Sequence, residues 1–331
     1  MTYRKPVPPM RSRAPVPAPA PTPAPTYRQD RLKLRHLRLL DLIGRHGSIG
    51  RAAREIGVSQ PAATLLVREI ETAFGASLVE RDRRGARLTA AGSHAVARLQ
   101  AALASIGRAI EAARETDGEP PLRLGCVQVA GVRTLPEALA HLETTGFAGR
   151  LQVREGRARD LLGDLCAGRL DAVVGWLDET IADGLPIDEL AIDPIREGRM
   201  QVVAAASHPL ARSRSVSVGE LSRARWIVPP PESRTHAAYR RLFVSYGAAP
   251  PPVAVECASL HASLRIVSTT RMLAVAPDDA VSAYRRLGMI AALRGRSLDL
   301  GHAPLSVFTR RDLPASPAML ALRGALRAGR G

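Results

Sequence analysis

The sequence predicts a multi-domain chain in which a small helical domain, one long helix and a larger α/β domain follow one another. Three observations lead to this fold class. Short helical patterns fill residues 31–75, an apolar heptad pattern covers residues 96–113, and from Leu122 onward short apolar runs alternate with helical segments. The 331 residues leave room for two or three domains, and 46% of them are apolar, so most of the chain should fold.

The charge of the chain indicates a polyanionic partner. The net charge is +16, and residues 31–116 hold 15 basic against 8 acidic side chains. A nucleic acid and an anionic membrane surface both fit such a charge. No apolar stretch approaches the length of a membrane span, so we expect a cytoplasmic protein with no membrane partner. Residues 1–30, rich in Pro and Ala, predict a disordered tail, with a weak accessory contact to nucleic acid as the alternative.

No pattern in the sequence predicts an enzyme, a cofactor or a metal site. The cysteines at 126, 166 and 257 are far apart and odd in number, which is typical of reduced thiols and argues against a disulfide framework or a zinc site. Phosphate-binding, zinc-hydrolase and nucleophile-elbow motifs are missing. His208 precedes a proline and is expected in a surface turn rather than as a catalytic base.

Residues 31–75 predict three short helices. The first lies near residues 34–45, Ser48 is the expected N-cap of the second, and Ser59 is the expected N-cap of the third, with Pro61 in its first turn. The buried stripe of the third helix follows from apolar residues at helical spacing, and a glycine ends it: Ala63, Val67, Ile70, Phe74 and Gly75.

The third helix should expose a set of side chains that suit the major groove of DNA. Gln can form paired hydrogen bonds with adenine, Thr can serve several bases, and an apolar side chain can meet a thymine methyl group. The residues near the start of this helix and off its buried stripe are Ser59, Gln60, Ala62, Thr64, Leu65 and Arg68. The alternative is an ordinary three-helix bundle with a solvated third helix.

A charged hairpin, or wing, is expected at residues 78–88. Two apolar ends flank a turn that contains Gly85, and the arginines of this segment are Arg81, Arg83, Arg84 and Arg87. A charged hairpin is commonly just solvated. Its position directly after the third helix favours contact with phosphates or with the minor groove.

A long helix should begin at Thr89, and its apolar residues recur at alternating steps of three and four. They form a heptad seam made of Val96, Leu99, Leu103, Ile106, Ile110 and Ala113. Such a seam pairs helices side by side and therefore predicts dimerisation. A single long helix within a bundle would show the same seam.

In order and spacing, these segments resemble the LysR-type family of bacterial transcription regulators. The resemblance is specific in residues 37–40, 47–53, 58–64, 70–71, 78–81 and 88–92. It is looser in residues 168–174 and 206–211. The resemblance implies a winged helix-turn-helix domain at 31–89, a dimerising linker helix at 90–117, and an effector-binding domain at 121–331 like a type 2 periplasmic binding protein. It implies a homodimer or homotetramer that binds double-stranded DNA and a small-molecule effector, with RNA polymerase as a further partner. It also places Gln60, Pro61 and Thr64 at the DNA face, where we also expect Ser48.

The α/β domain should hold its effector in a cleft between two subdomains. Subdomain I would comprise about residues 122–196 and 301–331, and subdomain II about residues 197–300, each with a largely parallel sheet covered on both faces. In such sheets ligands bind beyond the carboxyl ends of the strands. The expected cleft loops cover residues 127–131, 176–178, 229–235, 257–261 and 276–278, and the candidate residues are Val127, Gln128, Val129, Trp176, Ser233, Arg234, Thr235, Ser259, His261 and Pro277.

Helix N-termini in these loops favour negative charge, so the sequence predicts a small organic acid as effector. For Ser233, Ser259 and His261 a helix-capping role is the alternative. Two rival functions stay open at this point. One is an enzyme with a catalytic domain of the periplasmic-binding type, and the other is an architectural DNA binder that takes no ligand.

Overall fold

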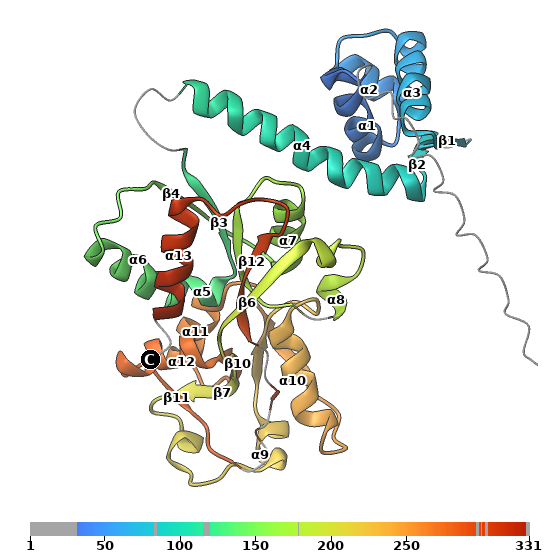
Figure 1. Ribbon diagram of the computed structural model, residues 1–331. Helices are drawn as coiled ribbons and strands as arrows, with labels where there is room; N and C mark the ends of the chain where they lie inside the picture. The colour runs from blue at the N-terminus through green and yellow to red at the C-terminus, as the bar shows by residue number, and fades with distance from the viewer. Residues whose placement is uncertain are drawn as a thin grey trace, which may run out of the picture.

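The structure is a computed structural model that describes residues 32–82, 85–114, 120–177, 179–295, 298, 300–301 and 304–328. The predicted tail, the wing residues Arg83 and Arg84, and Asp178 of the second cleft loop lie outside the described residues. Figure 1 shows a small N-terminal domain at one end of a long helix, and a two-part α/β domain beside that helix.

The N-terminal domain has three helices and a hairpin: α1 (Leu34–His46), α2 (Ile49–Glu55), α3 (Gln60–Phe74), β1 (Val79–Asp82) and β2 (Gly85–Leu88). The predicted caps are present, because the Ser48 hydroxyl accepts from the Arg51 amide at 3.3 Å and the Ser59 hydroxyl from the Ala62 amide at 3.4 Å. Gly75 ends α3 in the left-handed conformation, with φ 64°. Ala63, Val67 and Ile70 are buried as the periodicity predicts.

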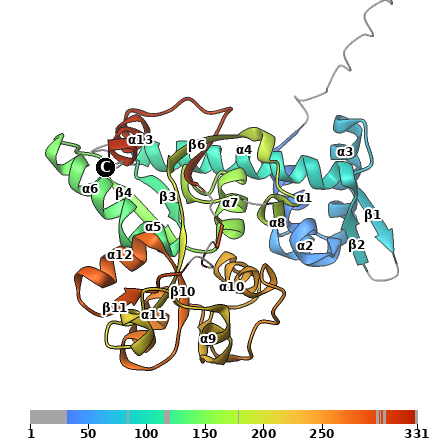
Figure 2. The ribbon, with the colours of Figure 1, turned by 90° about the horizontal axis from the view of Figure 1, so that it is seen from below.

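The long helix is α4 (Ala90–Arg114), which runs from the N-terminal domain along the α/β domain (Figures 1 and 2). The first part of its heptad seam packs inside its own chain. Val96 is buried in a cluster with Leu40, Ile70 and Leu78 of the N-terminal domain, and Leu99 packs against that cluster. The seam residues that remain for another partner are therefore Leu103, Ile106, Ile110 and Ala113, because Val96 and Leu99 already pack inside the chain.

Subdomain I is built on a five-stranded sheet in the order β4-β3-β5-β12-β6. Its strands are β3 (Leu122–Cys126), β4 (Leu151–Glu155), β5 (Ala172–Gly175), β6 (Leu190–Arg196) and β12 (Leu305–Arg310). Its helices are α5 (Gln128–Val132), α6 (Thr134–Thr144), α7 (Ala158–Cys166), α8 (Glu179–Ala182) and α13 (Pro317–Ala328). Strand β3 runs parallel to β4 and β5, whereas β12 runs antiparallel to β5 and β6.

Subdomain II has an antiparallel sheet in the order β10-β7-β11 and a parallel pair β8-β9. The strands are β7 (Met200–Ala205), β8 (Trp226–Val228), β9 (Val253–Glu256), β10 (Ala274–Pro277) and β11 (Ile290–Ala292), and the helices are α9 (Val218–Arg223), α10 (Arg234–Val244), α11 (Leu260–Thr269) and α12 (Asp278–Arg286). A bridge between Trp226 and Leu273 joins the two sheets. The centre of the Trp226 ring lies 5.1 Å from the centre of the tilted Tyr239 ring and 5.7 Å from that of the Phe243 ring, which meets it edge-on. The three rings form an aromatic core.

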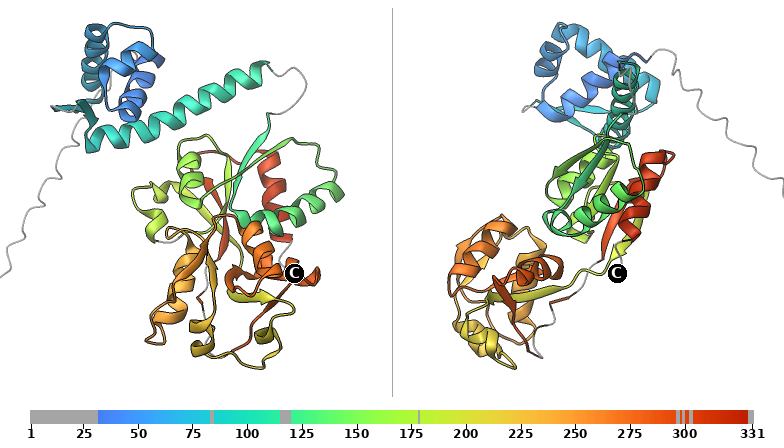
Figure 3. Two further views of the ribbon diagram at one scale, coloured as in Figure 1. Left: turned by 180° about the vertical axis from the view of Figure 1, so that it is seen from behind. Right: turned by 90° about the vertical axis from the view of Figure 1, so that its left-hand side faces the viewer.

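The expectation of largely parallel sheets is wrong, because both subdomains contain mixed pairings. The chain crosses from one subdomain to the other twice, between β6 and β7 and between β11 and β12 (Figure 3). The returning strand β12 enters between β5 and β6 and runs antiparallel to both. Strands β6 and β11 and the short helices α5, α8 and α9 were not expected from the sequence.

Candidate functional site

The start of α3 presents an exposed polar and apolar surface. The exposed residues here include Gln60, Pro61, Ala62 and Arg68. Leu65 is 56% exposed, so its apolar side chain does not pack into the core of the domain. The wing reaches this surface, since Arg81 Nη2 donates to the half-buried Thr64 hydroxyl at 3.0 Å. The structure thus brings Thr64 of α3 and Arg81 of the wing together, and Ser48 caps the start of α2.

Two sets of backbone contacts fix the wing next to α3. At its first strand, the Glu71 carboxylate accepts from the Leu78 amide at 2.8 Å and the Val79 amide at 3.1 Å. At its second strand, the Ala86 amide donates to the Gly47 carbonyl at 3.0 Å. Gly85 has φ 141°, and a Cβ there would lie 2.5 Å from the Gly47 carbonyl oxygen, so this close approach requires glycine. The wing is held at both strands and projects from the edge of the domain (Figure 2).

Several arginines of the N-terminal domain are exposed. They are Arg51, Arg54, Arg68, Arg81 and Arg87, and they come from α2, α3 and both wing strands. Guanidinium groups of this kind contact phosphates without reading sequence, whereas the side chains at the start of a helix can contact base edges. The N-terminal domain therefore offers exposed cationic side chains together with hydrogen-bonding and apolar groups at the start of α3.

The cleft between the subdomains is nearly closed. It holds about 20 Å³ and is lined by Val129, Trp176 and Leu305 of subdomain I, by residues 197–200 of the crossing segment, and by Arg234, Pro277, Asp278 and Asp279 of subdomain II. Four expected residues, Val129, Trp176, Arg234 and Pro277, line it. The crossing segment and Asp279 were missed, and Asp278 lies in the expected loop 276–278 but was not among the candidate residues; the acidic pair that follows β10 was a signal that could have indicated both aspartates.

Other expected cleft residues have different roles. Gln128 Oε1 accepts from the Leu260 amide at 3.2 Å and so bridges the subdomains. Val127 is buried at the start of α5. Ser233 and Ser259 cap α10 and α11, because their hydroxyls accept from amides three residues later at 3.1 and 3.2 Å. His261 Nδ1 pairs with the Tyr284 hydroxyl, and Thr235 is half-buried in the first turn of α10. The capping alternative therefore holds for both serines but not for His261.

One contact closes the cleft directly. The Arg234 guanidinium carbon lies 5.4 Å from the centre of the Trp176 ring. A cation over an indole face is a favourable contact, and it is stronger where water is excluded. Arg234 belongs to subdomain II and Trp176 to subdomain I, so the contact stabilises the closed arrangement.

A four-residue ion network joins the subdomains beside the cleft. The Asp279 carboxylate, 7% exposed, accepts from Arg133 Nη1 at 3.3 Å and from Arg196 Nη1 at 3.1 Å. Glu137 accepts from Arg133 Nε at 2.7 Å and from Arg196 Nη2 at 2.8 Å. Burial alone would raise the pKa of Glu137, but the hydrogen bonds from the two arginines outweigh it and lower that pKa. Sequence reasoning could not find this network, because its members come from three segments far apart in the chain: Arg133 and Glu137 at the start of α6, Arg196 and Asp279.

The remaining charged groups at the cleft have both signs. Arg199 and Arg234 are cationic, while Glu197 and Asp278 are acidic. Burial and the neighbouring Asp279 raise the pKa of Asp278. A ligand carboxylate could therefore be met by arginine, and a donor group by aspartate.

Two thiols are not activated, and the described acidic groups form no metal site. Burial raises the pKa of Cys126 and of Cys166 to about 11, so both remain protonated at neutral pH. Within the described ranges, no group of three or more His, Cys, Asp or Glu side chains is placed to hold a metal ion. In that same part of the chain no helix is both long enough and apolar enough to span a bilayer.

Comparisons with known proteins agree with this architecture. A family model described as "Bacterial regulatory helix-turn-helix protein, lysR family" matches residues 34–93, and one described as "LysR substrate binding domain" matches residues 116–330. The transcriptional regulator PcaQ of Agrobacterium fabrum is 26% identical over 301 residues, which cover 89% of this chain and 95% of PcaQ. The small neutral protease regulatory protein of Streptomyces coelicolor is 31% identical over 264 residues, which cover 77% and 78% of the two chains.

Solved structures share the fold. Full-length OxyR of Pseudomonas aeruginosa matches with a TM-score of 0.58 at 22% identity, covering 89% of this chain and 95% of its own. CbnR, described as a LysR family transcriptional regulator, matches with a TM-score of 0.55 at 19% identity, covering 91% and 100%. At these identities the likeness concerns the fold alone.

Proposed function

This chain belongs to the LysR family and is therefore a DNA-binding transcriptional regulator with a substrate-binding domain, not an enzyme. We propose that α3 reads the operator sequence. We also propose that an organic acid bound in the cleft controls the DNA-bound regulator. The observation that carries the first part is the exposed start of α3, where Gln60, Thr64 and Leu65 lie beside the wing. A protein that acts on DNA works where the DNA is, so we also propose a cytoplasmic location. RNA polymerase is the further partner we propose for the DNA-bound protein.

The DNA-reading role predicts a base-specific effect at Gln60. Gln60→Ala should cost roughly 1–3 kcal/mol at one base position and relax the preference there. Electrophoretic mobility shifts on the DNA upstream of the protein's own gene, with each base pair varied in turn, measure this. Gln152→Ala, which removes an exposed glutamine from β4, is the matched control and should change nothing. If the wild-type protein shows no preference for any fragment of that region, the proposal is wrong.

The wing should contribute to affinity without reading sequence. Arg81→Ala, Arg83→Ala or Arg84→Ala should weaken binding to all sequences alike and flatten the dependence of binding on salt by about one counterion each. The measurement is a set of dissociation constants between low and moderate salt. An effect confined to one base position would instead assign the substituted arginine to base recognition.

The cleft supports an acidic effector through Arg234 and Trp176. Its present volume is about 20 Å³, close to that of a single water probe and too little for a metabolite, so an effector must bind a more open cleft. A carboxylate that pairs with Arg234 would draw that side chain away from the Trp176 ring. A ligand that prefers the open cleft then shifts the population of the whole regulator toward it.

Trp176 fluorescence tests the class of effector. We expect a panel of small mono- and dicarboxylic acids to contain members that change the emission, while their amides do not. Trp176→Phe should remove the signal and Arg234→Gln should abolish binding, whereas Arg240→Gln, an exposed arginine on the same helix, should bind normally. If amides and acids act alike, the effector is not recognised as an acid.

The small cleft volume favours one other function, an architectural DNA binder without ligand. Such a protein needs no movement between the subdomains, so its cleft would be closed. The two functions differ in the acid panel: a regulator that senses a ligand gives at least one response that depends on Arg234, and an architectural protein gives none.

A further inference from the structure

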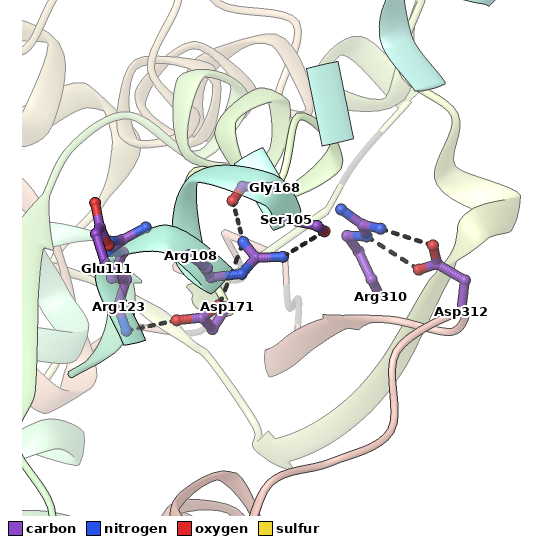
Figure 4. Close-up of polar contacts among 8 residues, drawn as sticks. All are labelled: Ser105, Arg108, Glu111, Arg123, Gly168, Asp171, Arg310 and Asp312. Carbon is purple, nitrogen blue, oxygen red and sulfur yellow. Dashed lines mark hydrogen bonds and ion pairs between the residues drawn. The ribbon is translucent and has the colours of Figure 1, made fainter. Parts of the chain in front are cut away.

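Helix α4 is attached to subdomain I of its own chain through Arg108. The Arg108 guanidinium donates to the Gly168 carbonyl at 2.5 Å and to the Ser105 hydroxyl at 2.9 Å, and it lies 3.9 Å from the Asp171 carboxylate. Figure 4 shows these groups around the guanidinium, with the turn that follows α7 facing the helix. The Arg108 and Asp171 side chains are each 20% exposed, so the contact is largely shielded from water.

The backbone approach at this contact is close. Gly168 has φ 71°, and a Cβ there would lie 3.1 Å from the Ala104 Cβ and 3.3 Å from the Ala101 Cα. Ala101 and Ala104 are small residues one turn apart on α4, and Ala101 is buried. The same Cβ would lie 2.9 Å from Nη1 of Arg310, a side chain whose Nε and Nη2 bind the Asp312 carboxylate in Figure 4. A side chain at position 168 would therefore be crowded against α4 and would need a strained backbone.

The contact continues into the sheet of subdomain I. The Asp171 carboxylate accepts from the Arg123 amide at 2.8 Å, and the Arg123 side chain forms an ion pair with Glu111 of α4. Arg123 lies at the start of β3 and Asp171 directly precedes β5. The other end of β3 leads into α5, which holds the cleft residue Val129, and the other end of β5 leads to Trp176 at the cleft. Two adjacent parallel strands thus connect the cleft with α4.

The attached face of α4 is opposite its heptad seam. At 100° per residue, Ala101, Ser105 and Arg108 point to one side of the helix, and Leu103, Ile106 and Ile110 point to the other side. Ile110 is 48% exposed, which leaves its apolar side chain accessible to another helix. One helix therefore has an intrachain contact on one face and an available apolar seam on the other.

We propose that the cluster formed by Ser105, Arg108, Glu111, Arg123, Gly168 and Asp171 fastens α4 to subdomain I, so that the two move as one body. A displacement of subdomain I relative to subdomain II then turns α4, and with it the seam and the N-terminal domain. This use of the movement rests on the proposed function, because it takes the cleft as the origin of the signal. The attachment itself requires neither DNA nor effector and can be tested without them.

Hydrogen exchange of the full-length protein, measured by mass spectrometry without DNA or ligand, tests the attachment. Arg108→Ala should accelerate exchange at least fivefold both in residues 98–114 and in residues 167–171, because both sides of the contact lose a partner. Arg98→Ala is the matched control, because Arg98 also pairs α4 with subdomain I, through Glu189, but is 76% exposed and lies outside the proposed cluster; it should change exchange less than twofold. Unchanged exchange of residues 167–171 in Arg108→Ala would overturn the proposal.

A second variant approaches the contact from the other side. Gly168→Ala adds a Cβ against Ala101 and Ala104 and should accelerate exchange in α4, whose own sequence is unaltered. If α4 exchanges as in the wild type, the turn does not hold it and the proposal fails. Melting of the variants, followed by circular dichroism, identifies general unfolding. Failure of DNA binding in mobility shifts would count against the proposed function and would leave the exchange result intact.

Discussion

The ion network beside the cleft makes a quantitative prediction. Asp279→Asn keeps the shape of the side chain but turns two charge-assisted hydrogen bonds from Arg133 and Arg196 into bonds with a neutral acceptor. Removing one partner of a fully buried pair costs about 3–5 kcal/mol. The cost here should be smaller, about 1–3 kcal/mol, because Glu137 still neutralises one arginine and the 3.3 Å bond from Arg133 is long.

Urea unfolding of the full-length protein, followed by tryptophan fluorescence, measures this cost. Trp176 reports the cleft and Trp226 the core of subdomain II, so loosening of the cleft should appear first at Trp176. A double-mutant cycle with Arg196→Gln should give a coupling of about 1 kcal/mol or more, as expected for groups in one network.

The control for Asp279 is another aspartate with two arginine partners. Asp193 pairs with Arg323 and Arg327 entirely inside subdomain I and is 16% exposed. Asp193→Asn should lower stability without an early change at Trp176. If Asp279→Asn and Asp193→Asn behave alike, or if the coupling with Arg196 is zero, the network does not hold the subdomains together.

Three further predictions follow from the same structure. The lowered pKa of Glu137 means that its contribution to stability is complete above its ordinary value of 4.5 and is lost as the pH falls through and below that value; in Glu137→Gln this part of the pH dependence of urea unfolding should vanish. Leu103→Glu should place unpaired charges at the seam and lower the oligomeric state in analytical ultracentrifugation, whereas Ala109→Glu on an exposed flank should not; a Leu103→Glu variant that stays associated contradicts the seam. Gly85→Ala should destabilise the N-terminal domain by more than about 1 kcal/mol, because the residue has a positive φ and touches Gly47; thermal denaturation checks this, and an unchanged melting temperature would show that the wing does not need this contact.

The N-terminal domain could be predicted from local sequence because local chemistry determines it. Ser48 and Ser59 satisfy free amides at helix starts, Gly75 takes the left-handed conformation, and the buried stripe of α3 has helical spacing. In the α/β domain, β6 was missed because Pro194 interrupts its pattern. The structure explains how this proline is tolerated, since β6 is at the edge of the sheet and needs a partner on one side only.

The cleft could be predicted only in part. Trp176, Arg234 and Pro277 follow strands or begin helices, and the rule that ligands bind at strand ends was enough to place them there. The partners of Asp279 are different, because Arg133 and Arg196 come close to it only after the chain has crossed between the subdomains. No local pattern encodes such a meeting.

The position of β12 has a consequence for the order in which the protein can fold during synthesis. This strand is inserted between β5 and β6, yet residues 197–304 separate it from β6 in the chain. A ribosome must therefore finish all of subdomain II before the sheet of subdomain I can close. Until then β5 and β6 would leave hydrogen-bonding edges open, which is a state prone to aggregation. The N-terminal domain has no such requirement, so a nascent chain can hold a finished DNA-binding domain while its sensor is still incomplete.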